Sequence, residues 1–316
     1  VYKRQRKALP ENTLGDSSVL VARNVAGEPN GVKTPDRTTS MANLDGVTSL
    51  IGYPAARLKT LAWHTQEYVR LAGRAAVGMV SRPFYPRDFV VQLDSVGVGS
   101  LGIVFLTGLF TGMVLALQSA IEMEQFGATI YIGRLVGASA VRELGPVLTA
   151  LMVTGRAGSG IAAELGAMRV TEQIDALQTM GVDPVRKLVV PRLAACLVAL
   201  PILTVITDLV AIFGGLLIAV VKLDLTADLY LRSVYQTLAQ TGFVLRYVPI
   251  DFVMGLTKPV FFGAIIALTS CHFGIRAGGG TEGVGRAATG AVVTASVLIL
   301  ATDYFLTQIL IALLIE

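Results

Sequence analysis

The chain has 316 residues, of which 53% are hydrophobic and only 15% are charged. A typical soluble domain carries roughly 25% charged residues, so this composition argues against an ordinary soluble enzyme. The formal net charge is +4, but residues 1–40 hold seven Lys/Arg against four Asp/Glu, which leaves only +1 for residues 41–316. No basic face for nucleic acid is therefore expected.

The first 53 residues precede any apolar run. Residues 1–40 are polar and rich in Pro, Gly, Asn, Ser and Thr without a sustained period, which predicts disorder. They lack the apolar segment of a secretory signal peptide. We expect residues 1–53 to be a disordered extension, Met41 to be the native start, and residues 54–316 to form the folded domain.

Residues 54–80 predict a basic amphipathic helix. Apolar side chains recur there at helical spacing, and basic residues lie between them: Arg57, Lys59, Arg70 and Arg74. Such a helix directly before a membrane span is typical of the membrane interface, and a soluble surface helix is the alternative. We expect Pro83 and Pro86 to end it.

Five apolar runs follow. They cover residues 98–119, 135–153, 193–221, 247–271 and 287–315. A helix needs roughly 20 apolar residues to cross the bilayer core, and only the second run, which contains Arg142 and Glu143, is weak by this measure. We therefore predict an all-α integral membrane protein with five transmembrane helices, preceded by the interfacial amphipathic helix.

Glycines four residues apart occur in the first two spans. The pairs are Gly108 with Gly112 and Gly133 with Gly137. This spacing lets helix backbones approach closely in lipid. The sequence leaves open whether they pack within the chain or at a subunit interface.

The loops after spans two and four carry more basic residues than the loops on the other side. Residues 155–192 contain five Lys/Arg and residues 272–286 contain two, whereas the opposite loops contain Arg134 and the group Lys222, Arg232 and Arg246. Together with the basic N-terminal region, this asymmetry predicts a cytoplasmic N-terminus and cytoplasmic loops after spans two and four.

Two glycine patterns and two cysteines carry no chemistry. Residues 155–160 resemble a phosphate loop but lack its lysine, and residues 278–283 follow a membrane span rather than a β-strand. Cys196 and Cys271 lie in apolar runs without C-x-x-C spacing. We expect neither nucleotide hydrolysis, nor a cofactor, nor a metal site in this chain.

Residues 160–180 predict a short amphipathic helix on the cytoplasmic side. Acidic residues interrupt two apolar stripes, and Gly181 and Pro184 are suited to end the helix. Two roles fit: docking into a groove of a partner, or packing beneath the bundle. The periodicity alone favours the second.

Charged residues inside the spans need partners or water. They are Arg142, Glu143, Asp208, Asp251, Lys258 and Asp303. Each costs about 2.5–3.5 kcal/mol at mid-membrane on insertion scales. Asp251 and Lys258 are seven residues apart, about 10 Å along one helix face. Contact with a lipid phosphate and interhelical ion pairing both remain open for Arg142, Glu143, Asp251 and Lys258, whereas structural or gating roles are expected for Asp208 and Asp303.

Two long segments resemble a known family. The sequence RELGPVLTALMVTGRAGSGIAAELGAMRVTEQIDALQTMGVDPVRKLVVPR at 142–192 resembles the signature region of the MlaE (YrbE) permeases, and EGVGRAATGAVVTASVLILATDYFLTQIL at 282–310 resembles their last cytoplasmic loop and final span. The resemblance extends over roughly residues 55–316.

This resemblance implies the membrane permease subunit of an ABC-type lipid transporter in the bacterial inner membrane. The implied partners are a second copy of the chain, a cytoplasmic ATPase that uses ATP and Mg, a periplasmic MCE-domain protein, a small cytoplasmic STAS-domain subunit, and phospholipid sheltered at the dimer interface. It also implies that the helix at 160–180 couples to the ATPase, through Glu164, Leu165, Met168, Arg169 and Glu172.

Two other functions remain alternatives. One is a proton-coupled secondary transporter of a hydrophobic substrate that relays protons through Glu143, Asp251 and Asp303. Five spans without a visible internal repeat argue against the common inverted-repeat transporters. The other is a membrane scaffold that transports nothing, against which the intramembrane charges argue weakly.

Overall fold

The computed structural model describes residues 63, 65–79, 81, 85–240, 243–244 and 248–314. The expected extension at 1–53, its Met41, and residues 54–62 of the amphipathic helix lie outside the described residues. Within the described part, five helices are long and apolar enough to cross a membrane, which confirms the predicted five-span all-α fold.

Residues 65–79 form a helix before the first span. Its place in the membrane interface stays a prediction. Span one consists of α2 (Pro86–Val96), η1 (Val98–Ser100) and α3 (Leu101–Glu124). Span two consists of η2 (Thr129–Tyr131), α4 (Ile132–Ser139), η3 (Ala140–Leu144), α5 (Gly145–Val153), η4 (Thr154–Gly158) and α6 (Ser159–Val170).

The second half of the chain contains the other three spans. Span three is η5 (Val185–Val189) with α8 (Val190–Leu223), span four is α10 (Ile250–Ile275) and span five is α11 (Gly280–Leu314). The connections contain α7 (Gln173–Thr179), α9 (Ala227–Gln240) and the antiparallel pair β1 (Phe243–Val244) and β2 (Val248–Pro249). The helix α9 lies in the segment between spans three and four, for which the sequence analysis predicted no helix.

Span two is much longer than its apolar run. It is helical over 42 residues, about 63 Å at 1.5 Å per residue, whereas a bilayer with its headgroups is about 40–45 Å thick. Part of this helix must therefore project beyond the membrane. Arg156, counted above with a cytoplasmic loop, lies within the helix, and its Nη1 donates to the main-chain oxygen of Ser95 at 3.0 Å and to Ser100 Oγ at 3.2 Å.

The expected single helix over residues 160–180 is wrong. The chain forms α6 up to Val170 and a separate α7 from Gln173, and the two residues between them turn the chain. Glu172 adopts a left-handed backbone conformation with φ of 60°, which a continuous helix does not permit. The turn places Ile174 in the apolar core.

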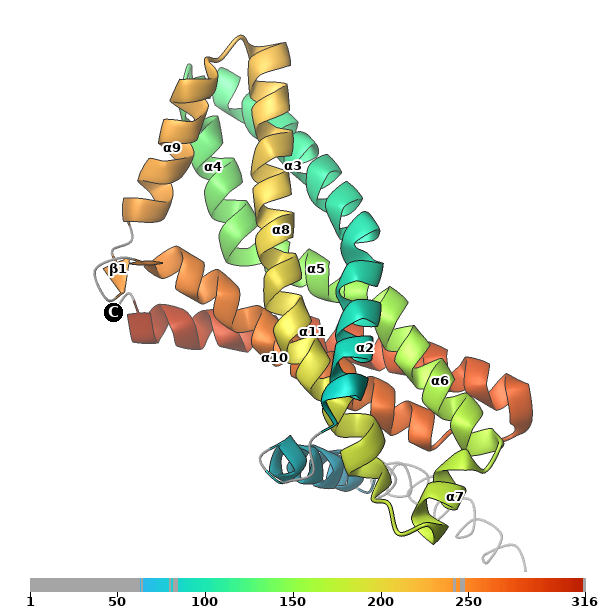
Figure 1. Cartoon of the computed structure of the whole chain (residues 1–316). Coiled ribbons are helices and arrows are strands. Elements are labelled where there is room, and N and C mark those ends of the chain that lie inside the picture. Colours follow the sequence, from blue (N-terminus) through green and yellow to red (C-terminus); the bar gives the residue numbers. More distant parts are fainter. Residues whose placement is uncertain are drawn as a thin grey trace, which may run out of the picture. The chain divides into compact units, whose positions relative to one another are not determined.

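Close packing of α3 on α8 holds the first half of the bundle together (Figure 1). A Cβ at Gly112 would collide with the main-chain oxygen of Ala211, and a Cβ at Gly108 would lie 3.0 Å from that of Thr207. Gly133 lies against Ser233 and the main-chain oxygen of Tyr230 on α9, and Gly137 lies against the side chain of Val234. These glycines therefore pack within the chain, which settles the question left open by their spacing.

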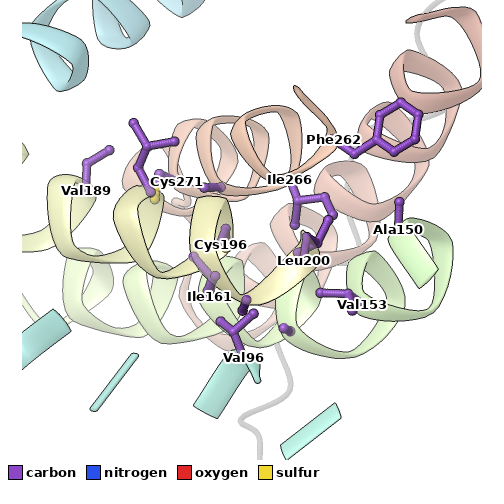
Figure 2. Packing of buried hydrophobic residues seen from close by; sticks show 14 of the residues in the cluster. Val96, Ala150, Val153, Ile161, Val189, Cys196, Leu200, Phe262, Ile266 and Cys271 are labelled. Carbon is purple, nitrogen blue, oxygen red and sulfur yellow. The ribbon is translucent and has the colours of Figure 1, made fainter. Parts of the chain in front are cut away.

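The larger apolar core joins span two, α8 and α10. Figure 2 shows Ile161, Cys196 and Ile266 among its buried side chains. Cys196 and Cys271 are both free and buried there, as small apolar residues would be. This core fixes span two against α10 and so positions the charged residues described next.

Candidate functional site

Five charged side chains meet between span two, α10 and α11, and we call them the ion network. They are Arg142 and Glu143 from η3, Asp251 and Lys258 from α10, and Asp303 from α11. Arg142 Nη2 lies 2.8 Å from Asp251 Oδ2. Lys258 Nζ lies 2.6 Å from Glu143 Oε2 and 3.2 Å from Asp303 Oδ1. Interhelical ion pairing, one of the two alternatives left by the sequence, is therefore present.

Lys258 is the fully buried cation of the network. Its side chain is fully buried, and its Nζ also donates to the main-chain oxygen of Arg142 at 3.0 Å. The ammonium group donates to this oxygen and to Glu143, and the carboxylate of Asp303 lies close enough to form an ion pair. A buried charge is tolerated only with such pairing, because removing it from water otherwise costs several kcal/mol.

The local sequence of span two explains why a main-chain oxygen is available. Pro146 follows η3 and has no N–H to donate to the carbonyl of Arg142 four residues earlier. The helix accommodates this position with a π-helical turn over Ala140–Leu144, a geometry frequent at functional sites. Lys258 then occupies the acceptor that the proline leaves without its ordinary partner.

The network is closed on one side and open on the other. The side chains of Asp251 and Lys258 are 0% exposed, whereas those of Arg142 and Glu143 are 36% and 42% exposed. With all groups ionised, two cations and three carboxylates give a formal charge of −1. An anionic ligand would therefore have to approach from the open side and share Arg142 with Asp251.

Asp303 and Asp208 have different surroundings. Asp303 belongs to the ion network, whereas Asp208 lies apart from it, buried on α8 against Gly145. Among the described residues, Asp208 Oδ1 has no hydrogen-bond partner. A Cβ at Gly145 would collide with this carboxyl oxygen, so a larger residue there would displace the side chain of Asp208. Gating roles for both aspartates stay predictions.

The residues expected to couple to an ATPase do not share one surface. Leu165 is fully buried, and Met168 packs against the same core. Arg169 pairs with Asp175 and so ties α6 to α7, whereas Glu172 is exposed at the turn. Leu165 thus supports the helix from inside, and the exposed surface consists mainly of the turn and α7.

Glu164 makes an ion pair that the sequence did not predict. Its Oε1 lies 2.9 Å from Nη2 of Arg192, whose side chain is almost fully buried in α8. Arg192 also donates to the main-chain oxygen of Leu188 at 2.7 Å. The pair connects the end of span two to the start of α8. The sequence analysis did not identify this contact because Glu164 and Arg192 are 28 residues apart.

Thr307 is a second residue that the sequence analysis missed. Its Oγ1 donates to Glu143 Oε1 at 3.3 Å, on the open side of the ion network. Thr307 follows Asp303 by four residues, so both lie on one face of α11. This four-residue spacing from Asp303 is the feature of the sequence that could have identified Thr307.

The chain is similar in sequence to known membrane permeases. The family described as Permease MlaE matches residues 89–309. A probable ABC transporter permease protein of Rickettsia conorii is 45% identical over 236 residues, which cover 74% of this chain and 88% of the relative. A protein of the same description from Synechocystis is 39% identical over 240 residues, with 76% and 88% covered.

One relative has a more specific description. The intermembrane phospholipid transport system permease protein MlaE of Haemophilus influenzae is 36% identical over 251 residues, which cover 77% of this chain and 93% of that protein. These matches confirm the resemblance drawn from residues 142–192 and 282–310.

Proposed function

The chain belongs to the MlaE permease family, and from this premise we propose that it moves phospholipid between the bacterial inner membrane and a periplasmic MCE-domain partner. It is a multi-pass permease subunit of an ABC transporter. In this proposal a separate cytoplasmic subunit binds ATP and Mg and hydrolyses ATP, and the STAS-domain subunit associates with it.

The ion network supports this proposal most directly. It places charged groups inside the membrane-length helices, with Arg142 and Glu143 reachable from one side. Intramembrane charges are expensive and mark substrate paths in many membrane proteins. A phospholipid offers an anionic phosphate to Arg142 and polar headgroup atoms to Glu143, while its chains remain in apolar surroundings.

The exposed apolar face of α11 supports a second copy of the chain, which would cover the open side of the ion network. Only 11% of the most apolar window of this helix is buried within the chain. Large apolar residues are exposed in a stripe of i, i+4, i+7 and i+11 spacing: Val293, Val297, Leu300 and Tyr304. Asp303 and the open side of the ion network lie next to this stripe, so a dimer would enclose them.

The turn between α6 and α7 is the proposed contact with the ATPase. Span two is long enough to project from the membrane, and this turn lies at its end. Met180, at the far end of α7, is 68% exposed. The pair of the exposed Glu164 with the buried Arg192 would pass a displacement of the turn to α8, and the pair of Lys258 with Glu143 links span two to α10. The basic loops after spans two and four support a cytoplasmic location for this end.

Reconstitution tests the proposal. The complex purified through this chain should transfer fluorescent phospholipid between vesicles only when ATP is present. Vesicles that contain this chain alone, with an imposed pH gradient and no ATP, should transfer none. Transfer in the second preparation would overturn the proposal in favour of proton coupling through Glu143, Asp251 and Asp303, each of which contacts a cation in the structure.

A further inference from the structure

A cleft of about 680 Å³ lies between helix 65–79 and the facing ends of α10 and α11, away from the ion network. Its lining is mainly apolar and aromatic, with arginines at one end; it includes Tyr68, Phe273, Arg276, Arg286, Ala287 and Leu298. A volume of this size fits a molecule of several hundred daltons. Nothing in the ion network uses this space.

The walls of the cleft are held in place by specific contacts. The hydroxyl of Tyr68 lies 3.3 Å from that of Thr269, which joins helix 65–79 to α10. The ring of His272 stands edge-on to Tyr68 and to Phe273. Burial raises the pKa of Tyr68 above its ordinary value, so its hydroxyl remains a neutral hydrogen-bonding group. Specific side-chain contacts therefore fix the position of helix 65–79 against α10 at this cleft.

The lining changes from charged to apolar along α11. Arg286 lies near the start of the helix and Leu298 lies twelve residues further, about 18 Å along the axis. Ala287 and Thr294 lie between them on the same wall. A ligand that fills this cleft must be charged or polar at one end and apolar over most of its length.

The charges around the mouth of the cleft favour an anion. Among the described residues, the charged side chains that line the cleft are two arginines, Arg276 and Arg286, and no carboxylate lines it. Arg276 pairs with Glu67 and stacks over Trp63, and Arg286 pairs with Glu282 at 2.6 Å. A guanidinium group has five N–H donors, so Arg286 can bind Glu282 and a phosphate together.

We propose that this cleft binds an anionic phospholipid of the leaflet against which helix 65–79 lies, with the phosphate at Arg286 and an acyl chain along Phe273, Ala287 and Leu298. Anionic lipids are common in the cytoplasmic leaflet and are attracted by basic juxtamembrane segments. The site is separate from the transport cavity and does not depend on phospholipid being transported.

Native mass spectrometry of the purified complex tests the site, with phosphatidylglycerol and phosphatidylcholine of identical chains as probes. The unaltered protein should retain phosphatidylglycerol about fivefold better than phosphatidylcholine, the order expected for one basic residue near the lipid phosphate. Arg286→Gln should remove this preference. Arg232→Gln is the matched control, because Arg232 makes the same i,i+4 pair with Asp228 on α9, which does not line the cleft.

A second pair of variants tests the acyl-chain path. Thr294→Trp fills the cleft and should lower the retention of both lipids, whereas Thr289→Trp, on an exposed part of the same helix, should not. Unchanged retention in both Arg286→Gln and Thr294→Trp would overturn the proposal, and so would release of the lipid by inorganic phosphate alone. If lipid is lost only in Lys258→Ala, the retained lipid lies at the ion network and the cleft is not a site. Because retention is measured without ATP, failure of transport leaves this result unaffected.

Discussion

Lys258 binds the main chain of Arg142 as well as the side chain of its neighbour. The Nζ atom donates to the oxygen of Arg142 at 3.0 Å and lies 2.6 Å from a carboxylate oxygen of Glu143. The oxygen is the one that Pro146 cannot engage, because proline has no N–H. One side chain of α10 thus stabilises both the π-helical turn of span two and the charge beside it, which makes the helix geometry depend on a buried cation.

The first prediction follows from this dependence. Lys258→Met keeps an unbranched side chain one atom shorter but leaves Glu143 and Asp303 without their cation and the oxygen of Arg142 without its donor. Breaking a buried pair costs about 3–5 kcal/mol, and the partial exposure of Glu143 places the loss near the lower value. We expect a clear fall in the melting temperature of the purified protein. Lys222→Met, at an exposed position of α8, is the control and should melt like the unaltered protein.

The pair of Arg142 with Asp251 allows structural and lipid-binding roles to be separated. Asp251→Ala should destabilise the protein, because Arg142 loses its partner on α10. Adding Arg142→Ala should restore part of the stability, with a coupling free energy of about 1–3 kcal/mol. Phospholipid transfer by the double variant should nevertheless stay low, since no cation remains on the open side of the network. Recovery of transfer together with stability would show that Arg142 serves Asp251 alone.

The sequence predicted the membrane spans and the charged face of α10, but it did not predict where the helices are interrupted. Hydropathy located all five membrane helices, and the seven-residue spacing of Asp251 and Lys258 correctly put both on one face. The π-helical turn at Ala140–Leu144 had a local signal in Pro146, but Lys258, which satisfies the oxygen of Arg142, is 116 residues away. The left-handed conformation of Glu172 has no signal in the apolar periodicity. The amphipathic helix α9 was detectable in principle, because Tyr230, Val234 and Leu238 recur every four residues.

The exposed end of α7, the helix that follows the turn, gives the third prediction. Met180→Asp should abolish stimulation of the partner ATPase and leave the melting temperature unchanged, because Met180 is exposed and contributes little to the core. Leu231→Asp, an equally drastic change at an exposed position of α9, should leave the stimulation intact.

Two further variants at the same end of the chain should behave differently. Leu165→Asp and Glu164→Lys should lower the melting temperature, because one buries a carboxylate and the other places a second cation beside the buried Arg192. Normal ATPase stimulation in Met180→Asp would show that the partner binds elsewhere.

The last prediction concerns the orientation of the chain in the membrane. A membrane-impermeant thiol reagent added outside the cytoplasmic membrane should label Ala227→Cys but not Thr171→Cys, since α9 follows span three and Thr171 follows span two. Both positions are exposed, so unequal labelling reports their side of the membrane rather than burial. The native Cys196 and Cys271 are buried, and the unaltered protein should therefore give no background. Permeabilised cells serve as the positive control, in which both variants should react. Labelling of Thr171→Cys in intact cells would invert the topology, and the turn between α6 and α7 could then not meet a cytoplasmic ATPase.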